Sequence, residues 1–419
     1  KIKMNFINKI VYIGMITNYL SIYCLQNYGT TSNLSKYLQS RHNKVAPPDN
    51  LIEVFIDIEL VHINSIDELH QKMSAVVYMV EEWIDPSLSW NPSDFFGITY
   101  TWLPIDIIWV PDIIIFNMLE YNNLLENIRA PVKIYSNGRV VYSYPALYTV
   151  MCHIEIEKFP FDEQRCSFDI ASWGYSEDKL YLNVSNKNYL KNYNSNDEWA
   201  LKKVFIEQTS YEHEGTVVSE AKYHIQVTRK PLHYVISLVI PCYIVCALSI
   251  AGLYARFSSK KERQERFTLG VTSILSMAVL SLVVSEKVPH SSLHIPLLIK
   301  YFLFQILVVT FATILTWPIL KFHREAFKNG GKIPPEWIFN ILLMKWKVNG
   351  IKEKYNDIKS QQRQLVIQGW TSIARRLDYT FATLFLFLTT APTIYILMSC
   401  AERLKAEDYG SLLYEKEKF

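Results

Sequence analysis

The stretch 265–286 combines residue types and a spacing that suit the wall of an ion-conducting pore. It reads ERFTLGVTSILSMAVLSLVVSE, with an acid near each end, hydroxyl groups after the first acid and aliphatic groups in the middle. On a helix, steps of three and four residues place one set on a single stripe: Glu265, Thr268, Thr272, Leu275, Val279, Leu282 and Glu286. Acids at both mouths would attract cations, and an aliphatic ring between them can expel water and close a channel.

An ordinary buried membrane helix is the alternative interpretation of this stretch. It carries no charge between Arg266 and Glu286. As a helix, this uncharged segment is long enough to cross most of a bilayer core. Its Ser and Thr side chains could form hydrogen bonds to neighbouring helices instead of lining water. The rest of the chain is needed to choose between the two.

Four long apolar runs indicate a membrane protein. They occupy residues 233–255, 266–286, 295–320 and 378–401, and all follow a soluble, aromatic-rich half that ends near residue 232. The chain has 419 residues, of which 50% are hydrophobic and 20% charged, with a formal net charge of +3. So small a net charge gives no case for nucleic-acid binding.

The loops between these runs predict their orientation in the membrane. Segment 321–377 holds twelve Lys or Arg and four acids, an excess of eight positive charges, and segment 256–266 holds five bases and two acids. Positively charged loops face the cytosol, so both segments belong there, with 321–377 as the main cytoplasmic loop. The soluble half and the tail 402–419 are then extracellular.

The N-terminal region has the layout of a secretory signal, which agrees with this orientation. Three lysines accompany an apolar run, and we expect a signal peptide over 1–25, with an uncleaved anchor as the alternative. A short amphipathic helix over 33–48, ending at Pro47-Pro48, should follow.

Residues 26–232 are expected to form an extracellular antiparallel β-sandwich. Short runs alternate between apolar and polar residues and are separated by turns, with no helical pattern between them. The clearest runs are 51–61, 72–80, 128–142 around the turn Ser136-Asn137-Gly138, and 221–228. Sequons at Asn33 and Asn183 would permit glycosylation of a secreted domain.

Cysteine usage separates one pair from the rest. Cys152 and Cys166 lie in the soluble half, and a disulfide between them is the default expectation for an extracellular domain. The other cysteines fall in apolar segments: Cys24, Cys242, Cys246 and Cys400. The last three should be free thiols that pack as small apolar groups.

The thirteen residues between the paired cysteines, HIEIEKFPFDEQR, contain Phe-Pro-Phe-Asp. With this spacing and the membrane segments that follow, the chain resembles the Cys-loop receptors, the pentameric ligand-gated ion channels. The stretch 265–286 resembles nicotinic acetylcholine receptor subunits. The resemblance implies an extracellular antiparallel β-sandwich followed by a four-helix transmembrane bundle, and a homo- or hetero-pentamer of homologous subunits in membrane lipid. It also implies Leu275 as the hydrophobic gate and Glu265 as an acid that favours cations.

The resemblance also implies an agonist site between neighbouring subunits. In this family aromatic rings surround a small amine, acetylcholine or a related agonist, which cation–π attraction holds. Position by position, the principal face would offer Phe116, Trp173 and Tyr211. The complementary face would offer Tyr78, Val141 and Ser143. We expect Trp83, Trp90 and Trp109 to belong to the core instead.

Coupling between agonist and pore is implied at four positions. The family pairs an acid with an arginine before the first membrane segment, here Glu68 with Arg229. The cysteine loop, with Pro160 after a peptide bond that is cis in relatives, should rest on the linker around Pro289. The alternative for Glu68 and Arg229 is a solvated acid and an ordinary interfacial base.

Differences from the pattern of acetylcholine-binding subunits leave the identity of the agonist open. The last binding loop, YEHEGTVVSE, has no pair of adjacent cysteines and no second tyrosine, so the subunit resembles the non-α kind or a divergent one. We expect a postsynaptic, plasma-membrane, multi-pass channel subunit that passes sodium and potassium, with calcium left open. The alternative is a structural or modulatory subunit of a heteropentamer. Enzyme motifs are absent from the sequence, and no catalytic residue, cofactor or metal is expected.

Overall fold

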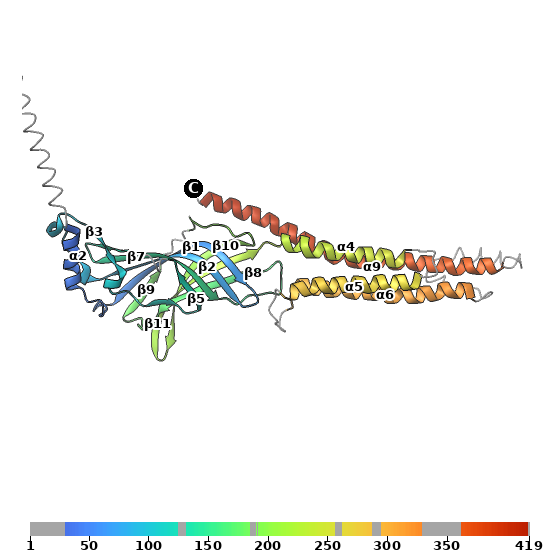
Figure 1. Cartoon of the computed structure of the whole chain (residues 1–419), viewed down its shortest axis with the longest axis horizontal. Helices are drawn as coiled ribbons and strands as arrows, with labels where there is room; N and C mark the ends of the chain where they lie inside the picture. The colour runs from blue at the N-terminus through green and yellow to red at the C-terminus, as the bar shows by residue number, and fades with distance from the viewer. Residues whose placement is uncertain are drawn as a thin grey trace, which may run out of the picture. The chain divides into compact units, whose positions relative to one another are not determined.

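The computed structural model describes residues 30–124, 131–184, 190, 192–255, 262–286, 295–328 and 362–417. They form two compact units (Figure 1). The first contains the described parts of 1–67, 71–154 and 164–227, and the second contains 68–70, 155–163 and the described parts of 228–419. The expected signal peptide over 1–25 and Pro289 lie outside the described residues.

The first unit is a β-sandwich of two sheets. Its strands are β1 Ile52–Asp67, β2 Lys72–Ile84, β3 Tyr100–Pro104, β4 Ile113–Ile115, β5 Met118–Asn123, β6 Pro131–Tyr135, β7 Arg139–Met151, β8 Glu163–Ser172, β9 Leu180–Val184, β10 Trp199–His213 and β11 Thr216–Arg229. One sheet has the order β3-β6-β7-β2-β1-β9, with β5 also paired to β7, and the other has the order β10-β11-β8-β4. Short 3-10 turns link strands at Pro86–Leu88, Pro92–Phe95 and Ile105–Ile107.

Antiparallel pairing predominates in the sandwich, as at β1–β2, β2–β7 and β4–β8. β1 and β9 run parallel, with Ile52 opposite Leu180, which is possible because a long stretch of chain, and no hairpin, joins them. The turn at 136–138 is where the sequence places it, with Gly138 at φ +84°. The strands on either side of it are β6 and β7, so the expected run 128–142 continues further than its pattern indicated, to Met151, while its residues 128–130 lie outside the described ones. The three core tryptophans Trp83, Trp90 and Trp109 are buried as predicted.

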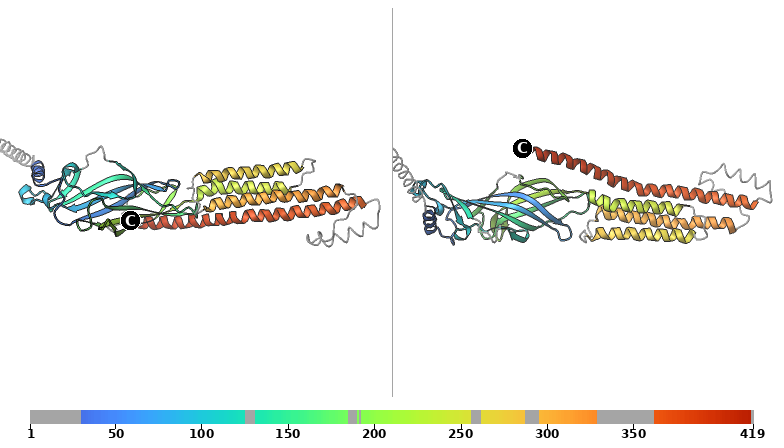
Figure 2. Two further views of the ribbon diagram at one scale, coloured as in Figure 1. Left: turned by 90° about the horizontal axis from the view of Figure 1, so that it is seen from below. Right: turned by 45° about the horizontal axis from the view of Figure 1, so that its top comes forward.

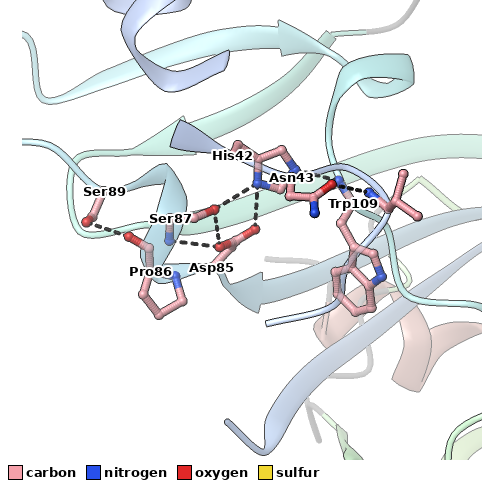
Figure 3. A network of polar contacts seen from close by, with 8 residues as sticks. His42, Asn43, Asp85, Pro86, Ser87, Ser89 and Trp109 are labelled. Atoms are coloured by element: carbon pink, nitrogen blue, oxygen red, sulfur yellow. Dashed lines mark hydrogen bonds and ion pairs between the residues drawn. The ribbon is translucent and has the colours of Figure 1, made fainter. Parts of the chain in front are cut away.

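The N-terminal helix is α2, Thr30–Arg41, and not the longer 33–48 expected from the sequence. It ends early because the next residue, His42, turns inward and is fixed by a polar network (Figure 3). Its Nδ1 lies 2.8 Å from Ser87 Oγ and 3.2 Å from Asp85 Oδ2, and its Nε2 accepts a 2.9 Å hydrogen bond from the backbone N–H of Trp109. Burial lowers the pKa of His42, against the opposing charge of Asp85.

The second unit contains helices long and apolar enough to cross a membrane (Figure 2). The elements are α3 Leu232–Tyr234, a π-turn at Val235–Val239, α4 Ile240–Tyr254, α5 Glu262–Ser285, α6 Leu297–Lys328 and α9 Gln362–Glu417. A shared apolar core joins α4, α6 and α9, with Tyr254, Ala312 and Phe385 among its members. Gly270 of α5 lies against Thr313 of α6, which leaves no room for a larger side chain there.

Three expected membrane segments differ from the helices observed. The first, expected as a helix over 233–255, contains the π-turn just before Pro241, because proline has no N–H to continue the regular hydrogen-bond ladder. The third, expected at 295–320, is α6, which continues to Lys328 in the segment expected as a cytoplasmic loop. The fourth, expected at 378–401, is the central part of α9, which continues through the expected tail to Glu417. Hydropathy marks only its apolar part, while the Ala, Glu, Lys and Leu residues beyond it still favour helix.

The disulfide Cys152–Cys166 is present, and Cys242, Cys246 and Cys400 are free and buried, as predicted.

Candidate functional site

Three of the predicted agonist-binding residues form one aromatic cluster. Phe116 follows β4, Trp173 follows β8 and Tyr211 lies in β10, all on the four-stranded sheet. The ring of Phe116 stacks on Trp173 at 5.9 Å between centroids and meets Tyr211 edge-on at 6.0 Å. Trp173 is 74% exposed, so a large aromatic face is available for recognition. Burial, and then the charge of Glu220, raises the pKa of Tyr211.

Asp112 holds the loop that presents Trp173. One of its carboxylate oxygens accepts a 2.6 Å hydrogen bond from Ser172 Oγ, and the other accepts one of 2.6 Å from the backbone N–H of Gly174. The N–H of Trp173 donates to the backbone oxygen of Asp112 at 3.2 Å. The exposed ring is therefore fixed at its backbone, which lowers the entropy lost when a ligand binds.

The other three predicted binding residues lie together on the seven-stranded sheet. Tyr78 of β2 is opposite Pro145 of β7, two positions along from Ser143, and Val141 follows on the same face. That face is directed away from the core, because Tyr78 and Ser143 are exposed. Within the described residues, the chain therefore presents the two halves of the expected site on different sheets.

The stripe predicted to line the pore lies on a face of α5 that is not packed against the other helices in the described part of the chain. Thr268, Thr272, Leu275, Val279, Leu282 and Glu286 are all exposed. Leu275, the expected gate, is 64% exposed. Glu265 also lies in α5, at a position where only the backbone is described. An aliphatic stripe that its own bundle leaves uncovered can face lipid, a neighbouring chain or a narrow dewetting pore, and the hydroxyl groups and the acid on this stripe favour the pore.

The opposite face of α5 is the one that packs. Arg266, Gly270, Ser273 and Met277 are buried on it. Arg266 lies 3.7 Å from Asp378 of α9 and donates a 2.9 Å hydrogen bond to the backbone oxygen of Ala255. The base next to the expected acid of the pore mouth is thus directed into the bundle and away from the stripe.

Arg229 forms the centre of a buried ionic cluster in the second unit. Its Nε lies 2.9 Å from Asp162 Oδ1, and its Nη2 pairs with both Asp162 and Glu68. Burial disfavours the charged guanidinium, but Asp162 and then Glu68 outweigh this effect and raise the pKa of Arg229. The predicted Glu68–Arg229 pair is confirmed, and sequence reasoning missed Asp162, the last residue of Phe-Pro-Phe-Asp.

The cysteine loop also contacts the helices of the second unit. The Phe159-Pro160 peptide bond is cis, as the resemblance implied, and Arg229 lies 4.9 Å above the ring of Phe159. The N–H of Leu297, which begins α6, donates to the backbone oxygen of Glu157 at 3.0 Å. From α9, Arg403 forms a 2.7 Å ion pair with Glu163. The loop is therefore tied to the chain before α3, to α6 and to α9.

Glu81 is a buried acid that the sequence analysis did not single out. It lies on the inward face of β2, and its Oε1 accepts a 2.8 Å hydrogen bond from the hydroxyl of Tyr144. Strand periodicity could have found it, because Val77, Met79 and the predicted core residue Trp83 share its face. No group of three or more His, Cys, Asp or Glu side chains in the described part of the chain is arranged to hold a metal ion.

Comparisons with known proteins agree with both units. The family model of the neurotransmitter-gated ion-channel ligand binding domain matches residues 31–231, and that of the neurotransmitter-gated ion-channel transmembrane region matches 238–347. The chain belongs to the family of neurotransmitter-gated ion channels, the Cys-loop receptors, and is not an enzyme. It is a subunit of a pentameric ligand-gated ion channel.

Individual relatives indicate the branch of the family. The chain is 50% identical to the proton-gated ion channel subunit pbo-6 of Caenorhabditis elegans over 94% of both chains. It is 31% identical to the acetylcholine receptor subunit alpha-type deg-3 of the same species, over 70% of this chain and 54% of that one. It is 30% identical to the human neuronal acetylcholine receptor subunit alpha-2, over 75% and 59%. The chain thus spans little more than half the length of these two nicotinic relatives.

Proposed function

We propose that the chain is a subunit of a cation-selective channel that opens in response to a stimulus received by its extracellular β-sandwich. The observation that carries this proposal is the stripe from Thr268 to Glu286, which α5 leaves exposed. Acids near both ends of the stripe would concentrate sodium, potassium and calcium over chloride, and Leu275 would form the closing ring. We infer a plasma-membrane location, with the postsynaptic site and glycosylation at Asn33 and Asn183 as further expectations.

We favour the proton as the stimulus. The support is the 50% identity to a proton-gated ion channel subunit, which extends over 94% of each chain. The binding loop around Tyr211 also lacks the adjacent cysteines that the resemblance associates with acetylcholine-binding subunits. A channel opened by acid needs an ionisable group that titrates near neutral pH and is coupled to conformation.

A small amine is the second candidate, favoured by the cluster of Phe116, Trp173 and Tyr211. The ring centroid of Phe116 lies 5.9 Å from that of Trp173 and 6.0 Å from that of Tyr211, and Trp173 is exposed. Such a cluster can bind a cation by cation–π attraction. Completion of the site would require Tyr78, Val141 and Ser143 of a neighbouring subunit. In a channel that uses protons alone, the same cluster would be a structural part of the subunit interface.

The test is current recording from cells that express the full chain, with external acid steps and a panel of acetylcholine, choline, betaine and biogenic amines. An acid-evoked current whose reversal potential follows sodium supports the favoured proposal. Trp173→Ala should then leave the acid response in place, whereas loss of an amine-evoked response in this variant supports the second candidate. A reversal potential that follows chloride contradicts cation selectivity. Silence with confirmed surface expression contradicts a functional homomer and leaves the structural or modulatory role in a heteropentamer.

A further inference from the structure

The interior of the first unit holds a carboxyl group with no cationic partner among the described residues. Glu81 is 3% exposed and lies between Ile56 of β1 and Tyr142 of β7, its neighbours across the sheet. Its one hydrogen bond comes from the hydroxyl of Tyr144, at 2.8 Å. Because burial of an unpaired charge is costly, a carboxyl group in this place is stabilised by taking up a proton.

The groups that face Glu81 are phenols and apolar side chains. From β7 come Tyr142, which stacks on Tyr144 at 4.6 Å, and Tyr148, which lies on the same face of the strand. From β5 comes Tyr121, stacked on Tyr148 at 5.1 Å.

The opposite sheet contributes an apolar contact to this tyrosine cluster. Phe168 of β8 lies 6.1 Å from Tyr148. Burial, followed by the charge of Glu81, raises the pKa of Tyr142 to about 12 and raises that of Tyr144 as well. The phenols therefore stay protonated near neutral pH, and within this described cluster Glu81 is the group whose charge can change there.

The environment sets the titration range of Glu81. Burial raises its pKa to about 7, and the hydrogen bond from Tyr144 opposes this rise by stabilising the carboxylate. The carboxyl is protonated in mild acid and ionised in mild base. Tyr121 is 45% exposed, so the cluster that surrounds Glu81 reaches the solvent from which a proton would come.

We propose that Glu81 is the residue through which external protons act on this channel. One proton from the external solution bonds to a carboxylate oxygen of Glu81, the negative charge disappears, and no other bond changes. Neutralisation removes the free-energy cost of burying a carboxylate. Acid therefore favours the conformation in which Glu81 is buried, and we assign this conformation to the open channel. The effect on current rests on the proposed function, whereas proton binding by Glu81 does not.

His42 is another buried group that could sense acid, but its contacts oppose this. Its Nε2 accepts a hydrogen bond from the N–H of Trp109, so this nitrogen can take a proton only if that bond breaks (Figure 3). Its Nδ1 faces Asp85 and Ser87. Burial lowers the pKa of His42, which disfavours protonation of the ring in mild acid.

Proton binding is tested by infrared titration of the purified full chain in lipid, which reads the carbonyl stretch of protonated carboxyl groups. Wild type should contain a band that grows as the pH falls from about 8 to about 6, and Glu81→Gln should remove it. Glu53→Gln is the matched control, because Glu53 is an exposed acid on the neighbouring strand β1. A wild-type spectrum without such a band, or a band that survives in Glu81→Gln, overturns the proposal whatever the current does.

The role in gating is tested by the acid response of the same variants. Gln resembles the protonated acid, so Glu81→Gln should give standing current at mildly alkaline pH and a flatter response to acid. Tyr144→Phe removes the hydrogen bond that stabilises the carboxylate, so its half-activation should move toward alkaline pH by about one unit.

The two measurements fail in distinguishable ways. A titrating Glu81 band without any acid-evoked current supports proton binding by Glu81 and contradicts proton gating. Acid-evoked currents that are the same in wild type, Glu81→Gln and Tyr144→Phe support proton gating and overturn the assignment to Glu81. Because Tyr144→Phe keeps the ring and the packing, it also serves as the test if Glu81→Gln does not reach the surface.

Discussion

Arg229 of the second unit and Glu81 of the first are both buried, yet their surroundings are opposite. Arg229, 1% exposed, lies between the carboxylates of Asp162 and Glu68 and keeps its charge at every physiological pH. Glu81 is hydrogen-bonded, among the described residues, by the Tyr144 hydroxyl alone, and burial raises its pKa to about 7. Burial alone does not decide what an ionisable group does. Carboxylates next to a buried group of opposite charge keep it ionised in a stable ion pair, as at Arg229. A phenol as hydrogen-bond donor leaves a buried carboxyl group able to bind and release a proton, as at Glu81.

The largest expected effect on stability comes from removing the buried ion pairs of Arg229. Arg229→Met leaves the carboxylates of Asp162 and Glu68 without their cation, and we expect a loss of stability of about 3–5 kcal/mol. Thermal unfolding of the full chain in detergent and surface labelling would both report it. Arg229→Lys, which keeps the charge without the forked geometry, is the control and should lose less. Normal stability and normal currents in Arg229→Met would contradict the role given to the cluster.

The two acids of the cluster should differ in importance. Asp162 is buried and contacts Arg229 through both of its oxygens, while Glu68 is partly exposed. Asp162→Asn should therefore destabilise the chain more than Glu68→Gln, whose loss should stay within about 1.5–3 kcal/mol, the value of a charged hydrogen bond. Double-mutant cycles with Arg229→Met would measure both couplings. Equal coupling energies for the two acids would contradict the greater importance given to Asp162.

Glu81 should make stability depend on pH with a defined sign. A carboxyl whose folded-state pKa is raised stabilises the folded chain at low pH, and this contribution disappears as the pH rises through about 7. The full effect of such a shift is on the order of 3 kcal/mol. The melting temperature of wild type should fall as the pH rises from about 4.5 to about 7 and then level off, and Glu81→Gln should flatten that dependence. A dependence of the same size in both proteins would show that another group is responsible.

His42 should give the smallest effect. His42→Gln preserves hydrogen-bonding capacity near Asp85 and Ser87 but cannot reproduce every contact of the ring, so a loss of about 1 kcal/mol is expected. The acid response should keep its midpoint, because burial lowers the pKa of His42 and so disfavours protonation of the ring. If His42→Gln shifted the pH of half-activation and Glu81→Gln did not, His42 and not Glu81 would be the residue that responds to acid.

Local patterns and motifs predicted much of this molecule. The Cys152–Cys166 disulfide followed from compartment and spacing, and the clustering of Phe116, Trp173 and Tyr211 followed from the family resemblance. The stripe on α5 followed from helical periodicity and remains a prediction as regards its role in the pore. The signals for the disulfide and the stripe each lay within one motif or one helix, whereas the aromatic cluster joins residues from β10 and from the ends of β4 and β8.

What sequence reasoning missed depends on contacts between distant residues. Asp162 is part of a visible motif, but only the fold brings it to Arg229, 67 residues away. Glu81 was passed over because two adjacent acids suggest the end of a strand, and β2 continues to Ile84. Helix ends were missed for a related reason, since α2 ends where His42 finds its partners and α9 continues where hydropathy falls.

The most direct test of the channel assignment needs no agonist. In Leu275→Ser, the aliphatic ring becomes wettable, and we expect a standing current in cells that express the full chain. Its reversal potential should shift when external sodium is replaced by a large cation and stay fixed when chloride is replaced. Ser276→Leu, a change at a neighbouring exposed position outside the stripe, should produce no such current. Absence of a standing current in surface-expressed Leu275→Ser, or a reversal potential that follows chloride, would contradict a cation pore lined by this stripe.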